Sequence, residues 1–117
     1  MPVRIKRIYD EPDETDGVRI FVDRLWPRGL SKGNAHVDEW LKEVAPSNSL
    51  RKWFGSKPGR WDGFKKRYTK ELESSDTSKL LHTLNVMAKE EPITLLFAAK
   101  DTEHNNALAL VEILKKK

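Results

Sequence analysis

The sequence predicts a single α/β domain, spanning residues 1–117, with a mostly parallel sheet of at least three strands and helices on both faces. Residues 18–22 and 93–98 are short apolar runs, which are typical of strands buried on both sides of a parallel sheet. Amphipathic stretches with helical spacing lie between the two runs. A chain of 117 residues suits one domain with its own core, and we find no internal repeat or linker.

Composition excludes several kinds of chemistry. The chain has no cysteine, which excludes disulfides, thiolate zinc sites, iron–sulfur clusters and cysteine nucleophiles. The three histidines, His36, His82 and His104, lack a metal-ligand spacing, so we expect no metal and no cofactor. The amino terminus does not resemble a signal peptide, and the longest apolar run is too short to span a bilayer. We therefore expect a cytoplasmic monomer or small homo-oligomer without a membrane partner.

The first third of the chain predicts two strands and two loops. Residues 3–9 alternate in polarity, which indicates a strand with one wetter face near a sheet edge. Residues 10–16 are acidic and without periodicity, which predicts an exposed loop before the strand that begins at Val18. Residues 31–35 are small and polar and predict a second loop. Asp38 then predicts the cap of a short helix. The apolar residues of that helix are Trp40, Leu41 and Val44.

The middle of the chain predicts helices. Ser47 offers a cap for a helix that ends at Gly55, and Pro58 is placed to open a longer helix that reaches about Ser74. One side of the longer helix carries an aromatic stripe that we expect to be largely buried, which favours a core face over base stacking. The stripe consists of Trp61, Phe64, Tyr68 and Leu72.

The last third predicts a helix, a buried strand and a final helix. Ser75 or Asp76 is expected to cap the first helix, and the strand follows Pro92. Asp101 or Thr102 is expected to cap the final helix, which would run from about Glu103 to Leu114. Because the strands at 18–22 and 93–98 read as fully buried, we expect both to be central, and neighbouring or one strand apart.

The first candidate site segment is the stretch from Gly17 to Gly29, G-V-R-I-F-V-D-R-L-W-P-R-G, where a strand opens into a loop. Arg24 and Arg28 carry planar guanidinium groups suited to phosphate or carboxylate, with Trp26 as a wall. Asp23 is the candidate acid or base. The alternative is an internal ion pair between Asp23 and an arginine, which would leave no group free to act.

The second candidate segment follows the late strand. Lys100, Asp101 and Asn105 are candidate ligand-binding residues, and His104 can transfer protons near neutral pH. Exposed N–H groups at a helix start attract anions. Simple helix capping by Asp101 or Thr102 is the alternative, although it does not explain Lys100.

Both segments leave the carboxyl ends of strands, which lie along one edge of a parallel sheet. We therefore expect Asp23, Arg24 or Arg28, Lys100 and His104 to line one concave site for a small anionic ligand, in an enzyme or a degenerate enzyme.

The alternative function is a non-catalytic module that binds nucleic acid or protein. Its contacts would be Lys65, Lys66 and Lys70 together with the final lysines at 115–117. The formal net charge is +4, and most of it comes from that tail. Any nucleic-acid binding is therefore expected to be weak and nonspecific.

Several motifs together resemble the YeaO-like bacterial proteins, a domain-of-unknown-function family. They include V-D-R-L-W-P-R-G at 22–29, L-R-K-W-F-G at 50–55 and L-L-F-A-A-K-D at 95–101. The resemblance covers nearly the whole chain and implies an α/β domain, with Asp23-Arg24 as the counterpart of an Asp-Val-Arg motif in longer members. Those members carry cysteines near the late strand and following helix, where this chain has Phe97 and Asn105. The resemblance therefore implies no thiol chemistry here.

Overall fold

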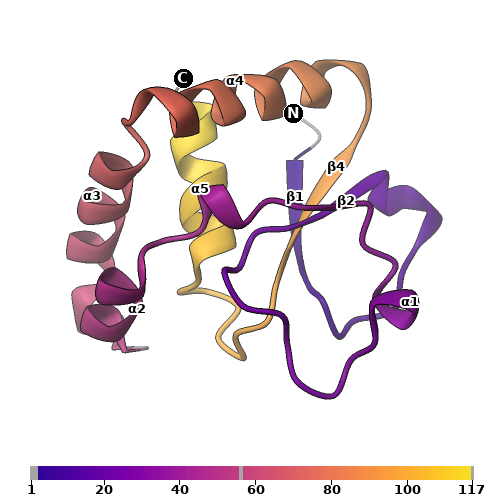
Figure 1. Ribbon diagram of the computed structural model, residues 1–117, viewed down its shortest axis with the longest axis horizontal. Coiled ribbons are helices and arrows are strands. Elements are labelled where there is room, and N and C mark those ends of the chain that lie inside the picture. Colours follow the sequence, from indigo (N-terminus) through magenta and orange to yellow (C-terminus); the bar gives the residue numbers. More distant parts are fainter. Residues whose placement is uncertain (1–2, 56, 117) are drawn as a thin grey trace.

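The computed structural model describes residues 3–55 and 57–116 (Figure 1). Its centre is a four-stranded sheet in which every neighbouring pair is parallel, in the order β1-β4-β2-β3. The α/β class with a parallel sheet is thereby confirmed, and so are the central, neighbouring positions of β2 and β4. The edge position of β1 also agrees with its mixed polarity. The strands are β1 (Val3–Arg7), β2 (Val18–Phe21), β3 (Glu39–Trp40) and β4 (Ile93–Phe97).

Strand β4 is a central strand that joins β1 to the rest of the sheet. It pairs with β1 on one side and with β2 on the other, so that Ile93 lies opposite both Val3 and Val18. All five of its residues are buried. The continuous apolar run is explained by this position, because a central parallel strand is covered on both faces and has no side that faces water.

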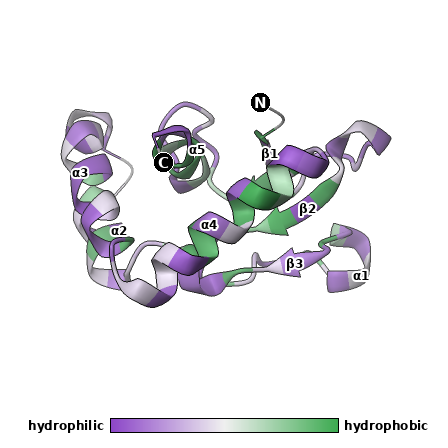
Figure 2. Ribbon diagram, turned by 90° about the horizontal axis from the view of Figure 1, so that it is seen from above, coloured by the Kyte–Doolittle hydropathy of each residue, from purple (hydrophilic) through white to green (hydrophobic). Residues whose placement is uncertain are grey.

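Four helices lie on one face of the sheet and one short helix contributes to the other. Ile93, Leu95 and Phe97 face the four-helix side, where the larger core cluster lies. Leu96 and Phe21 face the opposite side, which is covered by Ala35 of α1 and by loop residues. In Figure 2 α3 is mostly hydrophilic, in keeping with its place at the outside of the layer. The four helices are α2 (Asn48–Phe54), α3 (Trp61–Glu71), α4 (Ser75–Glu90) and α5 (Asn106–Lys115), and the short one is α1 (Lys32–Ala35).

The aromatic stripe on α3 is mainly core. Phe64, Tyr68 and Leu72 are at most 2% exposed, as predicted. Tyr68 donates a hydrogen bond to the carbonyl of Val44, and burial raises the pKa of its hydroxyl. Trp61 is partly buried and packs against the core cluster, so it is the least covered residue of the stripe. It lies in the first turn of α3, where its ring contacts an imidazole described below.

Two predictions for residues 31–44 were wrong. The segment expected to be a loop contains α1, which is capped by Ser31. The helix expected after Asp38 is instead the short strand β3, followed by a 3₁₀ turn at Lys42–Val44. The reason is tertiary: Asp38 exchanges hydrogen bonds with the backbone of Arg19 in β2, through both its amide and its carboxylate. That exchange aligns the chain with the sheet before a helix can begin.

The predicted helix boundaries were right for α2 and shifted for the others. Ser47 and Gly55 cap α2 as expected. A 3₁₀ turn at Pro58–Arg60 precedes α3, which ends at Glu71 instead of near Ser74. Ser74 caps α4, one position before the predicted Ser75 or Asp76. Asn105 caps α5 in place of Asp101 or Thr102, so that helix begins three residues later than Glu103.

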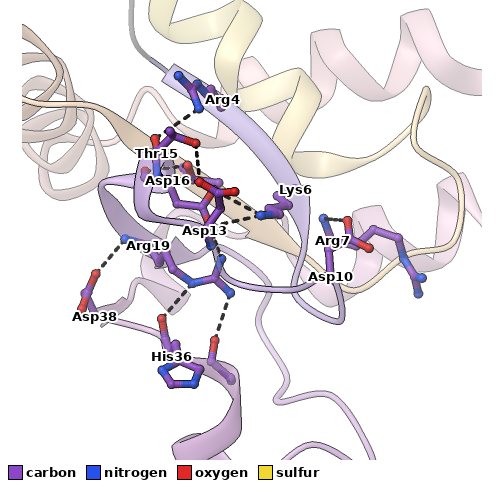
Figure 3. Close-up of polar contacts among 12 residues, drawn as sticks. Arg4, Lys6, Arg7, Asp10, Asp13, Thr15, Asp16, Arg19, His36 and Asp38 are labelled. Carbon is purple, nitrogen blue, oxygen red and sulfur yellow. Dashed lines mark hydrogen bonds and ion pairs between the residues drawn. The ribbon is translucent and has the colours of Figure 1, made fainter.

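The acidic segment 10–16 is exposed at residues 10–15, as expected, and buried only at its last residue. That residue, Asp16, ends the 3₁₀ turn Glu14–Asp16 and is 4% exposed. The Asp16 carboxylate bonds Arg19 Nη1 at 2.6 Å and Lys6 Nζ at 3.2 Å (Figure 3). Arg19 also donates to the carbonyls of Ala35 and His36, which ties α1 to the sheet.

Candidate functional site

A cavity of about 740 Å³ lies outside the carboxyl ends of β2 and β4. The loops that leave these strands form one wall, and residues of α2, α3 and the start of α5 form the rest. The strand ends thus meet at one edge of the sheet, and the cavity occupies the place where open α/β sheets bind ligands.

Asp23 is the first polar group beyond β2 and holds three strand ends together. Its Oδ2 accepts a hydrogen bond from the amide of Ala98, which follows β4, at 3.1 Å. Its carbonyl accepts one from Trp40 Nε1 of β3 at 2.7 Å. Its Oδ1 is buried and has no hydrogen-bond partner in the described part of the chain. Burial raises the pKa of Asp23, although the Ala98 amide, the Asn106 side chain and the charge of Arg51 act in the opposite direction.

Three positively charged side chains line the cavity: Arg24, Arg51 and Lys52. Arg24 does not pair with Asp23. Its guanidinium donates to the carbonyls of Pro46 at 3.2 Å and Ala45 at 3.1 Å, which anchors the loop before α2. The internal ion pair considered from the sequence is therefore not found among residues 3–55 and 57–116.

His104 lines the cavity between β4 and α5. Its Nδ1 lies 3.0 Å from Asp101 Oδ2, and its ring meets the Trp61 indole edge-on, with 5.4 Å between centroids. Hydrogen bonds from the backbone of Glu103, and then from the side chain and backbone of His104, hold the pKa of Asp101 below its ordinary value. Asp101 thus fixes the imidazole's orientation from outside the cavity lining.

The cavity brings together four of the eight residues predicted for the site. Asp23, Arg24, His104 and Asn105 line it. The side chain of Asn105 caps α5 through the amide of Leu108, so its oxygen is already engaged.

The other four predicted residues do not line the cavity: Trp26, Arg28, Lys100 and Asp101. Trp26 packs edge-on against Phe21 on the opposite face of the sheet, and its Nε1 donates to the carbonyl of Leu30. Arg28 and Lys100 are exposed outside the cavity. The loop after β2 crosses to the far face beyond Leu25, which separates Arg28 from Asp23.

Sequence reasoning missed the contribution of α2. Arg51 and Lys52 line the cavity, as does Asn48 in the first turn of the same helix. The sequence marks this helix clearly through its caps, but nothing in it indicates a role in the site. No local signal tells which edge of the sheet α2 covers, since that depends on the path of the chain after β3.

The described residues offer no cluster of three or more His, Asp and Glu side chains that could hold a metal ion. In the same ranges, 3–55 and 57–116, we find no helix with the length and apolarity needed to cross a membrane.

The fold and the cavity define a class: a small parallel α/β domain with a mixed polar and apolar cavity at the carboxyl edge of its sheet. The family model described as "Inactive DUF488-N3 subclade" matches residues 2–117, and the chain belongs to this family.

Relatives match over nearly the full length. The chain is 42% identical over 115 residues to "Uncharacterized protein YeaO" of Escherichia coli (strain K12), which covers 98% of both chains. It is 38% identical over 112 residues to "Uncharacterized protein Rv3073c" of Mycobacterium tuberculosis (strain H37Rv), covering 96% of this chain and 92% of the relative. The resemblance seen in the sequence motifs is thereby confirmed. No solved structure matches the chain significantly.

Proposed function

We propose that the cavity at the carboxyl edge of the sheet binds a small anionic ligand. The observation that carries this proposal is the charge of the lining: Arg24, Arg51 and Lys52 surround a cavity in which Asp23 is the only acidic residue among the described lining residues. Guanidinium and ammonium groups that converge on a concave surface favour phosphate or carboxylate.

The environment of Asp23 supports the same proposal. A raised pKa favours the neutral carboxylic acid, which repels an anion less than a carboxylate does and can donate a hydrogen bond to it. The amino terminus of α5, a helix of ten residues, lies beside the cavity and adds a favourable dipole.

Binding is favoured over catalysis. The description of the family subclade as inactive fits a chain in which Phe97 and Asn105 stand where the resemblance places cysteines in longer members. In this proposal, Asp23 and His104 contact the ligand as hydrogen-bonding groups, and Asp101 positions the imidazole of His104.

Thermal unfolding in sodium phosphate, compared with sodium chloride at equal ionic strength, tests the proposal. A ligand at a hundred times its dissociation constant adds about 2.7 kcal/mol to the free energy of unfolding. The Arg51→Gln variant should lose that shift and keep its unliganded midpoint, because Arg51 is exposed and its guanidinium donates an exposed hydrogen bond to Asn48 Oδ1 of the same helix. The control is Lys66→Gln, which removes an exposed positive charge outside the cavity. An equal phosphate shift in the wild type and in Arg51→Gln would refute the proposal.

The second candidate is a non-catalytic module that binds nucleic acid or protein through the basic face of α3 and the lysines at 115–117. Lys66, Lys70, Lys115 and Lys116 are all exposed, which favours it. Lys65 is less available, because its Nζ lies 3.5 Å from Glu112 and 3.9 Å from Asp62.

A further inference from the structure

We propose that the ligand of this cavity is a nucleoside monophosphate, with its phosphate on the basic side and its base against the apolar side. This inference rests on the proposed anion binding and adds the chemical class of the ligand.

The size of the cavity argues for an organic body. Its volume of about 740 Å³ lies well inside the range of roughly 300–1,000 Å³ that is usual for sites of drug-sized molecules. An inorganic phosphate ion would fill only a small part of this space. The ligand therefore carries a body several times larger than its anionic group.

The lining has an apolar side that suits a planar ring. Its apolar lining residues include Pro46, Phe54 and Phe64, and the two rings have centroids 4.7 Å apart. Leu25 is a lining residue that is 62% exposed. A single exposed leucine is ordinary on a protein surface. Here it lines the same cavity as two buried aromatic residues, so a ring bound between them would cover it and lengthen the apolar contact.

The charge argues for a phosphate monoester over a monocarboxylate. Three cationic side chains exceed what one carboxylate can neutralise, whereas a phosphate monoester carries close to two negative charges near neutral pH. The surrounding segment, residues 48–67, contains seven lysines and arginines against one acidic residue, Asp62. Guanidinium groups also match the geometry of phosphate oxygens in a bidentate manner.

Two amide side chains of the lining, those of Asn48 and Asn106, suit the edge of a base. Asn48 Oδ1 accepts from Arg51 Nη1, which leaves its amide nitrogen to donate. Asn106 Nδ2 donates to the carbonyl of Val22, which leaves its oxygen to accept. A nucleobase presents donors and acceptors on its edge and apolar faces above and below its plane, so it uses both kinds of lining.

Calorimetric titration of the intact chain tests the inference with a matched series of compounds. The series is AMP, GMP, CMP, UMP, ribose 5-phosphate, adenosine and inorganic phosphate. At least one nucleotide should bind about tenfold or more tighter than ribose 5-phosphate, which lacks only the base. The nucleotide that binds most tightly should also bind about tenfold or more tighter than its own nucleoside, which lacks only the phosphate and replaces adenosine in the series where that nucleotide is not AMP.

Two pairs of variants separate the two sides of the cavity. Leu25→Ser should weaken nucleotide binding several-fold and leave phosphate binding unchanged, whereas Val86→Ser, an exposed residue of α4 outside the cavity, should change neither. Lys52→Gln should weaken both nucleotide and phosphate, whereas Lys66→Gln should weaken neither.

The outcomes distinguish the nucleotide inference from the more general proposal that the cavity binds a small anion. If ribose 5-phosphate and phosphate bind as tightly as every nucleotide and depend on Arg51, the cavity binds anions and the nucleotide inference is overturned. Nucleosides that bind as tightly as nucleotides would overturn it too, since the basic side would then contribute nothing. If no phosphate compound binds at all, both the inference and the proposed anion binding are overturned.

Discussion

Asp16 is a buried carboxylate that joins two strands and a helix. It bonds Lys6 of β1 and Arg19 of β2, and Arg19 reaches the carbonyls that end α1. Burial by itself would raise the pKa of Asp16. The hydrogen bonds from the Asp13 backbone, from Arg19 and from Lys6 outweigh burial and hold that pKa below its ordinary value.

Replacing this carboxylate should be costly. Asp16→Asn leaves the buried Arg19 without its counter-charge, which should lower the free energy of unfolding by about 3–5 kcal/mol. Urea denaturation at pH 7 measures the loss. Glu14→Gln, at an exposed position in the same turn, is the control and should stay within about 0.5 kcal/mol of the wild type.

The pH dependence of this effect has a defined sign. Because the folded-state pKa of Asp16 is lowered, its stabilisation is fully present above the unfolded value of 3.8 and is lost as the pH falls through the folded value. The difference in the free energy of unfolding between the wild type and Asp16→Asn should therefore become smaller below pH 4. A difference in the free energy of unfolding that stays constant from pH 7 to pH 3 would contradict the lowered pKa of Asp16.

Asp23 should behave in the opposite way. Its folded-state pKa is raised, so the stability that it contributes is present below 3.8 and is lost as the pH rises through the folded value. Asp23→Asn keeps an oxygen for the Ala98 amide and removes the titration. The stability of the variant relative to the wild type should therefore increase between pH 4 and pH 7. Denaturation without ligand over this range checks the sign, and a relative stability that falls with pH would refute it.

At the level of elements, α3 is held by a few large side chains. Phe64 packs against Phe54, Trp61 and Tyr68, with ring centroids 4.7, 5.7 and 5.6 Å away. Phe64→Ala should lower the free energy of unfolding by about 3–5 kcal/mol, as large-to-small core changes do. Lys66→Ala, on the exposed side of the same helix, is the control. A loss below about 1 kcal/mol for Phe64→Ala would show that the stripe is not the main attachment of α3.

The elements that could be predicted from the sequence are those fixed by local signals. Strand β4 is marked by four apolar residues and one threonine after a proline, and α2 by a serine cap and a glycine stop. Strand β3 has only two residues and owes its conformation to β2, so its own sequence indicates a helix equally well.

The candidate site was predictable for Asp23, which follows β2, because parallel topology places the strand ends at one edge of the sheet. Closeness to a strand end did not decide the other positions: Lys100 is nearer to the end of β4 than His104, yet His104 lines the cavity and Lys100 does not. Arg51 and Lys52 belong to a helix whose packing no local pattern specifies. Arg28 and Lys100 were misplaced because exposed loop residues are free to turn away from the strand that precedes them.

For the molecule as a whole, the charge distribution predicts weak and salt-sensitive nucleic-acid binding. Deleting residues 115–117 should lower the magnitude of the salt slope by about 0.9 for each duplex phosphate contact that is lost. Fluorescence anisotropy with a labelled duplex at several salt concentrations measures it. Lys79→Gln with Lys89→Gln, at two exposed positions of α4, is the control for general charge. Tight nucleic-acid binding that survives both moderate salt and the deletion would contradict the prediction and favour the second candidate function over anion binding.

The order of the strands also has a consequence for folding during synthesis on the ribosome. β1 and β2 are made well before β4, yet they do not pair with each other. β2 can pair earlier with the short strand β3, but its longer pairing and the pairing of β1 both need β4. Until Ile93–Phe97 leave the exit tunnel, the edge of β2 that faces β4 stays unpaired, in an interval when nascent chains are prone to aggregate. Closure of the sheet must therefore follow synthesis of β4, and ending the polypeptide before β4 should leave it unable to fold.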